Sequence, residues 1–198
     1  YNIDIDVLKS KLEKADAIGL LPKVIVAVDF SGQSCDMKSI YILSQKYGFK
    51  VIEDASHAIG GKYKNKPIGN CDYCDIAVFS FHPVKIITTG EGGMALTNNG
   101  LIDASLKRLR SHGITRDESL MEKGSHGGWY YEQIELGFNY RMTDIQAALG
   151  LEQLKHVDEF VIKRKEIASK YNKSLKKLPL ILPWHHSDSD SAHHLYVV

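Results

Sequence analysis

Residues 76–97 read IAVFSFHPVKIITTGEGGMALT, and the order of residue types in this stretch favours an α/β fold. Residues 76–81 are β-branched, aromatic and small, which is typical of a strand buried on both faces. The pattern breaks at residues 82–83, and a single lysine, Lys85, follows within four residues of the strand end. A glycine-rich turn at residues 90–93 then returns the chain into a second apolar run.

A lysine at the carboxyl end of a buried strand lies where open α/β sheets bind their ligands. Burial lowers the pKa of an ammonium group, so the amine can lose its proton and attack a carbonyl. An upstream strand predicted for residues 49–54 ends on Glu53 and Asp54. Pyridoxal 5'-phosphate (PLP) needs this combination, a lysine for its aldehyde and a carboxylate for its pyridine nitrogen. The alternatives are a solvated surface charge for Lys85 and a helix cap for Asp54.

Four motifs occur in series: EDASHA at 53–58, FSFHPVK at 79–85, TTGEGG at 88–93 and GFNYRMTDIQAALGL at 137–151. Together they resemble the DegT/StrS family of PLP-dependent sugar aminotransferases. The similarity keeps its order from about residue 24 to residue 171. It implies an α/β protein with the type I aminotransferase fold, in which a mostly parallel central sheet is flanked by helices.

The resemblance also implies roles for individual residues. Lys85 would hold PLP covalently and act as the general base, and Asp54 would pair with the pyridine nitrogen. His57 would hydrogen-bond near the phenolic oxygen of PLP, and the hydroxyl of Ser80 would bind its phosphate. Asn139 would cross a dimer interface to the phosphate in the partner subunit, which implies a homodimer with shared sites. The alternatives are a partly exposed loop histidine for His57 and a buried, backbone-bonded serine for Ser80.

Residues 110–117, RSHGITRD, contain two basic candidates for substrate binding, His112 and Arg116. The family carries a similar motif at the mouth of its active site, and basic groups suit a nucleotide diphosphate. The alternative is a solvated loop. The glycine- and aromatic-rich residues 118–133 could close over a sugar.

The motifs are most similar to those of family members that act in pseudaminic acid biosynthesis. This similarity implies amino transfer from an amino acid, glutamate, to C4 of a UDP-linked 4-keto-6-deoxy-N-acetylhexosamine, with ping-pong kinetics. Two other functions stay open. One is a PLP-dependent or pyridoxamine-dependent sugar dehydratase of the same fold, in which a histidine replaces the lysine; Lys85 argues against it, although His82 is close. The other is a non-catalytic sugar-binding module.

Composition excludes several broad classes. The 198 residues are 43% hydrophobic and 25% charged, as in ordinary globular proteins. The net charge of +1 gives no indication of nucleic acid or of an anionic membrane surface as a partner. No apolar run is long enough for a membrane span, and no signal peptide opens the sequence. Three cysteines are too few for a disulfide framework, so a reducing cytoplasm is expected.

Two groups of residues have the composition of metal ligands, but neither has a convincing pattern. Cys71 and Cys74 have the spacing of half a zinc site, without a second pair. A redox pair is equally unsupported, because no helix start follows. The histidines at 185, 186, 193 and 194 lie among serines and aspartates that predict a flexible turn. No metal is therefore expected.

Periodicity and capping residues predict the remaining elements. A helix is expected over residues 5–17, and the continuous apolar run at 23–30 is the stretch most expected to form a buried strand. A helix at 37–47 would be capped by Asp36 and ended by Gly48, which completes a βαβ unit. The other expected elements are a hairpin with its turn at 65–66, a helix at 101–109, and a long helical stretch at 144–178 with a break near His156.

The sequence begins with Tyr1 and ends in an apolar run. We therefore expect a central piece of a longer protein, lacking the N-terminal part and most of the small C-terminal domain. Residues 1–155 would be the central part of the PLP-binding large domain. Residues 156–178 would be a connecting helix, and residues 179–198 the start of the small domain.

Overall fold

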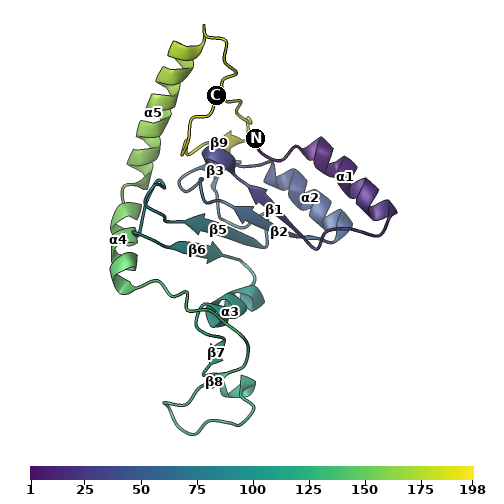
Figure 1. Cartoon of the computed structure of the whole chain (residues 1–198), viewed down its shortest axis with the longest axis vertical. Helices are drawn as coiled ribbons and strands as arrows, with labels where there is room; N and C mark the ends of the chain where they lie inside the picture. The colour runs from purple at the N-terminus through teal and green to yellow at the C-terminus, as the bar shows by residue number, and fades with distance from the viewer.

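A four-stranded sheet with the order β1–β2–β5–β6 lies at the centre of the computed structural model, which describes residues 1–198 (Figure 1). Strands β1 (Val24–Val28), β2 (Lys50–Asp54) and β5 (Ile76–Ser80) are parallel. Strand β6 (Gly93–Leu96) runs antiparallel to β5. The predicted α/β fold with a mostly parallel sheet is therefore confirmed.

The first two strands form the predicted βαβ unit around helix α2 (Met37–Tyr47). The Asp36 side chain caps this helix by accepting a hydrogen bond from the Ser39 amide at 3.3 Å. Gly48 ends it in the left-handed region, with φ +77°. Helix α1 (Ile5–Ala17) packs beside α2 on the same face of the sheet (Figure 1). Both helices match their predicted positions.

The two faces of the sheet differ sharply in burial. Ala27, Val51 and Phe79 face the helices and belong to a core of 19 residues that also contains Ile40. The opposite face of β1 is open, with Val24, Val26 and Val28 exposed by 46%, 51% and 42%. The prediction of a strand at residues 23–30 is confirmed, but its expected burial was wrong, because β1 lies at an edge of the sheet and helices cover only one of its faces. In β5, too, burial alternates along the strand, rather than being complete on both faces.

A second, small sheet has the order β4–β3–β9. Strands β3 (Lys62–Tyr63) and β4 (Lys66–Pro67) form the predicted hairpin, but its turn lies one residue earlier than expected, at Lys64 and Asn65. Both turn residues have positive φ, as a two-residue loop of type I′ requires. Strand β9 (Ser189–Asp190) adds to β3 and brings the C-terminal segment across the body.

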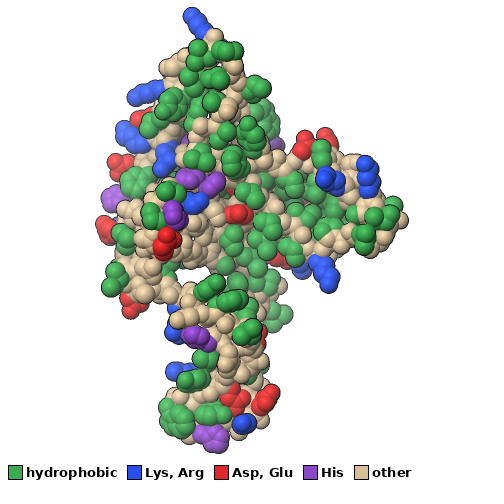
Figure 2. All heavy atoms as spheres, in the orientation of Figure 1, with side chains coloured by type: hydrophobic (Ala, Val, Ile, Leu, Met, Phe, Trp, Pro, Cys, Tyr) green, Lys and Arg blue, Asp and Glu red, His purple; other side chains and the backbone are tan.

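An arm projects from the body after β6 (Figures 1 and 2). It contains α3 (Gly100–Leu109), in agreement with the predicted helix at 101–109, and the short pair β7 (Ile114–Thr115) and β8 (Glu132–Gln133). Two 3-10 turns complete the short elements, η1 (Phe30–Gly32) before α2 and η2 (Glu118–Leu120) in the arm.

The chain returns from the arm into α4 (Asp144–Leu154) and α5 (Val157–Leu175), with the predicted break at residues 155–156. Thr143 and Gln146 form a capping box at the start of α4. No helix is both long enough and apolar enough to cross a bilayer. The predicted division into residues 1–155, 156–178 and 179–198 stays a prediction.

Ile40 offers a test of the core between α2 and the sheet. Its side chain is fully buried, so Ile40→Ala should lower the free energy of unfolding by about 2–5 kcal/mol. Ile42 lies on the same helix but is 56% exposed, and Ile42→Ala should change stability by no more than about 0.5 kcal/mol. Urea denaturation followed by circular dichroism measures both, and equal losses would contradict this description of the core.

Candidate active site

The carboxyl ends of β2 and β5 bring two polar side chains to one edge of the sheet. Asp54 pairs in register with Val78, and Ser80 lies two residues further along β5. Because side chains alternate along a strand, Asp54 and Ser80 share the face opposite the helices. Both are half-buried. The site therefore begins where parallel strands end, as the sequence predicted.

Asp54 is not a helix cap. The residues that follow it form turns, and its Oδ1 accepts a hydrogen bond from the Ser56 amide at 3.1 Å. The rest of the carboxylate has no hydrogen-bond donor from the protein. An anionic group with spare acceptor capacity faces the open side of the sheet.

Lys85 lies in the loop between β5 and β6 and is half-buried, less deeply than the sequence suggested. Its neighbours Ile86 and Ile87 are buried and anchor the loop. The loop is closed by two hydrogen bonds to the Phe81 carbonyl, one from the Thr88 hydroxyl at 2.9 Å and one from the Thr89 amide at 3.1 Å. The Lys85 amine itself makes no ion pair and no hydrogen bond within the chain. The Lys85 side chain is thus unpaired, and it extends from a loop whose backbone is held by hydrogen bonds.

The third and fourth sequence motifs pack against each other at the base of this loop. Gln146 Nε2 donates a hydrogen bond to the Glu91 carbonyl at 2.9 Å. A Cβ on Gly92 would lie 2.3 Å from Thr89 Oγ1 and 2.9 Å from Met142 Cε. The absence of a side chain at Gly92 thus allows these two side chains to approach its backbone closely.

His57 lies beside Lys85 and Asp54. Its Nδ1 accepts a hydrogen bond from the Ser31 amide at 3.3 Å, so the neutral ring carries its proton on Nε2. Burial lowers the pKa of His57, the nearby Lys85 charge lowers it further, and Asp54 opposes them. The structure thus brings together four of the predicted residues, Asp54, His57, Ser80 and Lys85, at one end of the sheet.

His194 was missed by the sequence reasoning. Its ring lies 4.6 Å from the His57 ring, and burial, with the charges of His57, Lys85 and Arg164, lowers its pKa to about 4. The expected flexible turn was wrong at this point, because Arg164 Nη1 donates to the carbonyls of His193 and His194 at 3.3 and 3.2 Å. No local sequence signal could have placed it, since its partners lie far away along the chain.

A pair of buried acids, also missed, lies under the site. Asp29 is fully buried, and its Oδ1 accepts a hydrogen bond from the Cys35 amide at 2.8 Å while its Oδ2 has no partner. Burial, and next the charge of Glu53, raises the pKa of Asp29 well above its usual range. Burial also raises the pKa of Glu53. Glu53 thus belongs to the core, whereas Asp54 faces the open side.

The three remaining predicted residues lie on the arm, apart from the Lys85 loop. His112 has a positive φ of 62° and donates its amide to the Phe138 carbonyl at 2.8 Å. Arg116 is exposed at the end of β7. Asn139 is exposed and pairs through its backbone with Ser111. Within one chain, the structure does not bring these three residues to Lys85.

The cysteine and histidine groups do not form a metal site. No group of three or more histidine, cysteine, aspartate or glutamate side chains is arranged to hold an ion. All three cysteines are free thiols. The His185 and His193 rings contact each other edge to face at 5.2 Å.

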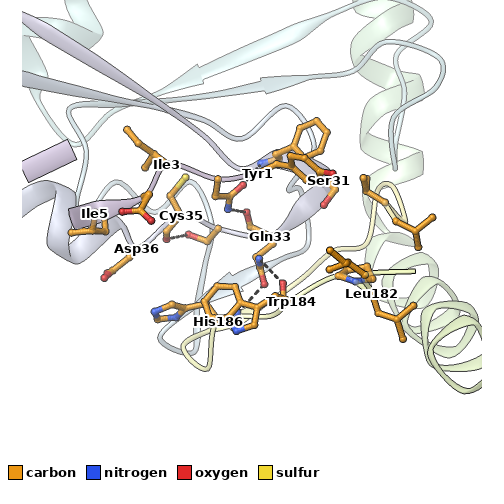
Figure 3. A pocket seen from close by; sticks show the side chains of 18 of the residues that line it. Tyr1, Ile3, Ile5, Ser31, Gln33, Cys35, Asp36, Leu182, Trp184 and His186 are labelled. Carbon is orange, nitrogen blue, oxygen red and sulfur yellow. Dashed lines mark hydrogen bonds between the residues drawn. The ribbon is translucent and has the colours of Figure 1, made fainter. Parts of the chain in front are cut away.

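A cavity of about 770 Å³ lies elsewhere, lined mainly by residues 1–6, the loop after β1 and residues 179–184 (Figure 3). Its walls include Gln33, whose Nε2 donates to the Trp184 carbonyl at 3.2 Å. It contains none of Asp54, Ser80 and Lys85. Its size therefore does not make it the site of the lysine chemistry.

Known proteins with similar sequences identify the family of this chain. The model of the DegT/DnrJ/EryC1/StrS aminotransferase family matches residues 1–198. The chain belongs to this family. A UDP-4-amino-4,6-dideoxy-N-acetyl-beta-L-altrosamine transaminase of Campylobacter jejuni is 44% identical over 177 residues, which cover 89% of this chain and 43% of the relative. The predicted family is therefore confirmed.

Solved structures agree with the sequence match. Helicobacter pylori PseC, an aminotransferase involved in the biosynthesis of pseudoaminic acid, has a TM-score of 0.83 and 35% identity. The match covers 98% of this chain and 48% of PseC. Spr1654 of Streptococcus pneumoniae, solved in a PLP form, has a TM-score of 0.77 and 28% identity over 98% of this chain and 50% of its own. The chain thus spans about half the length of these relatives, and it has the fold of PLP-dependent aminotransferases.

The residues of the cluster fit PLP. Lys85 offers an unpaired amine for the aldehyde, and Asp54 offers a carboxylate oxygen without a donor from the protein for a protonated ring nitrogen. His57 presents an N–H on Nε2, and Ser80 presents a hydroxyl at the strand end. Aminotransferases of this family depend on PLP, in agreement with the predicted cofactor.

The buried acids predict how stability depends on pH. Their pKa values are raised by folding, so their contribution is fully present below the unfolded value of about 4 and is lost as pH rises through the raised values. Asp29→Asn keeps a side-chain oxygen that can accept the hydrogen bond from the Cys35 amide, and it removes the titrating carboxyl group. This variant should be more stable than the wild type near pH 7 and should have a flatter profile. The slope removed is up to about 1.4 kcal/mol per pH unit.

Urea denaturation at several pH values measures this effect. Asp16→Asn is the matched control, because Asp16 is exposed at the end of α1. A profile for Asp29→Asn that is parallel to that of the wild type would contradict the raised pKa of Asp29.

Proposed function

We propose that the protein is a PLP-dependent aminotransferase. It would move an amino group from an amino acid, glutamate, to C4 of a UDP-linked 4-keto-6-deoxy-N-acetylhexosamine, in a pathway of the pseudaminic acid type. The observation that carries the proposal is the free amine of Lys85 beside Asp54 and His57 at the carboxyl edge of the sheet. The names of the Campylobacter and Helicobacter relatives support the sugar substrate.

Each residue has a separate task in this proposal. When bound, PLP supplies an electron sink for the bond that is broken at the amino-bearing carbon. Lys85 Nζ would hold the cofactor, and as general base it would take up and return the proton at the amino-bearing carbon. Asp54 keeps the ring nitrogen protonated. His57 donates from Nε2 to the cofactor, and Ser80 donates to the phosphate.

The dehydratase alternative is weakened by the position of His82. Its Nε2 lies 3.7 Å from Glu91 Oε1, and its ring is about half exposed. Lys85 therefore remains the residue of this loop that faces His57 and His194. A non-catalytic sugar-binding module would not depend on the Lys85 amine, which makes that residue the test.

A homodimer with shared sites is supported by the surface around Asn139. Apolar side chains next to it are exposed, and they continue onto α4: Leu136, Phe138, Tyr140, Ile145 and Leu149. The rings of Phe138 and Tyr140 stack at 4.8 Å. Exposed apolar patches of this kind mark protein interfaces. His112 and Arg116 lie on the same arm, which supports a role at the shared site, where they would bind the nucleotide diphosphate.

The predicted cytoplasmic location remains part of this proposal. All three cysteines are free thiols, which agrees with a reducing compartment.

Lys85→Ala tests the aminotransferase proposal. The wild type with added PLP should develop a visible absorption band, and after borohydride reduction PLP should be attached to Lys85, as mapped by mass spectrometry. Lys85→Ala should lose the band and the adduct, and transamination should fall by about 100-fold or more. Lys9→Ala, at an exposed position of α1, should behave like the wild type.

An adduct on another lysine would overturn the assignment of Lys85. Sugar binding that is unchanged in Lys85→Ala, with no transamination by the wild type, would favour the binding module.

Mixing two inactive variants tests the shared site. Lys85→Ala and Asn139→Ala should each be impaired, since each lacks one group of the proposed site. After mixed refolding, heterodimers would contain one intact site, so activity should return to about a quarter of the wild-type value. Asn98→Ala, at an exposed asparagine before α3, is the control variant and should by itself be as active as the wild type. A mixture no more active than the separate Asn139→Ala variant would contradict a shared site.

A further inference from the structure

The C-terminal segment, defined here as residues 189–195, crosses the loops that follow β1 and β2. Strand β9 pairs with β3, and the Ala192 amide donates to the Gly32 carbonyl at 2.9 Å. A Cβ on Gly32 would lie 2.9 Å from the backbone nitrogens of His193 and His194, so the two backbones are in direct contact. Arg164 of α5 holds the segment from the other side. The position of His194 is therefore determined by backbone contacts.

His194 supports one side of the His57 ring. The two ring centroids lie 4.6 Å apart, with the planes inclined by 42°. The other contacts of His57 are weaker: a 3.3 Å hydrogen bond from the Ser31 amide and the Phe30 ring at 5.9 Å. The ring of His194 is therefore the nearer of the two aromatic rings against which the His57 ring packs.

The Nδ1 atom of His194 is buried and has no hydrogen-bond partner. The charged and titratable groups that face His194 are His57, Lys85 and Arg164. All three disfavour a cationic ring, and burial, the largest effect, does so as well, which keeps the pKa of His194 low. Burial and Lys85 also lower the pKa of His57. Near neutral pH, two uncharged rings therefore pack against each other.

We propose that His194 is a positioning residue of the PLP site, whose ring packs against His57 and directs the His57 Nε2–H toward the cofactor. The inference rests on the proposed function. His194 acts through His57 and exchanges no proton with the substrate. Because the contact requires an uncharged ring, His194→Phe should keep the position of His57, whereas His194→Ala should not.

Three variants test the inference: His194→Ala, His194→Phe and the control His185→Ala. His185 is exposed on the preceding loop and contacts His193. The first readout is the pKa of His57 in the cofactor-free protein, from proton NMR of the histidine rings. His194→Ala should admit water to the ring and raise this pKa toward its usual value, while His194→Phe should keep it low. His185→Ala should leave it unchanged.

The second readout is PLP affinity, measured from the visible absorption band. Loss of an aromatic pair should weaken binding about 2- to 10-fold in His194→Ala. His194→Phe and His185→Ala should bind PLP like the wild type. Circular dichroism checks that each variant is folded.

Two results would overturn the inference: a His57 pKa and PLP affinity in His194→Ala equal to those of the wild type, or a folded His194→Phe variant as impaired as His194→Ala. Failure of the proposed function is distinguishable. In that case the wild type itself gives no absorption band and no adduct on Lys85, while the NMR readout still reports on the contact between His194 and His57.

Discussion

The parallel register of β1, β2 and β5 is the constraint on which the rest of the structure depends. It aligns the carboxyl ends of the strands, so the loops that carry His57 and Lys85 leave the sheet at the same edge. The pleat of β2 then separates two adjacent carboxyl groups. Glu53 enters the core beside Asp29, while Asp54 faces the open side. Glu53 is thus kept in a low-dielectric environment, and Asp54 is available to pair with the protonated pyridine ring of PLP, as proposed above.

The Lys85 loop has the rigidity that a covalent cofactor site needs. It is held by two hydrogen bonds to the Phe81 carbonyl, and Gly92 packs against Thr89 without space for a side chain. Gln146, from the start of α4, holds the loop from outside. The third and fourth family motifs are therefore parts of one structural unit, although Gln146 lies 55 positions after Glu91 in the sequence.

The proposed site is assembled in layers of different origin. Asp54, His57, Ser80 and Lys85 come from the sheet and its loops, whereas His194 is delivered by the C-terminal segment. Asn139, His112 and Arg116 lie on an arm whose exposed apolar surface suits a second subunit. The sheet and its loops thus supply only part of the proposed site, and the arm and the C-terminal segment supply the rest.

The sequence by itself determined the βαβ unit, the caps of α2, the helix break near His156 and the four residues at the strand ends. These depend on periodicity, on capping residues and on motifs a few residues long, all of which are local. Only the tertiary structure decided that β1 is an edge strand with an open face, because a continuous apolar run does not reveal which strands pair or which faces helices cover. Tertiary structure likewise decided the burial of Asp29 and the contact of His194 with His57. Both depend on packing between segments far apart in the chain, and no spacing along the sequence encodes that packing.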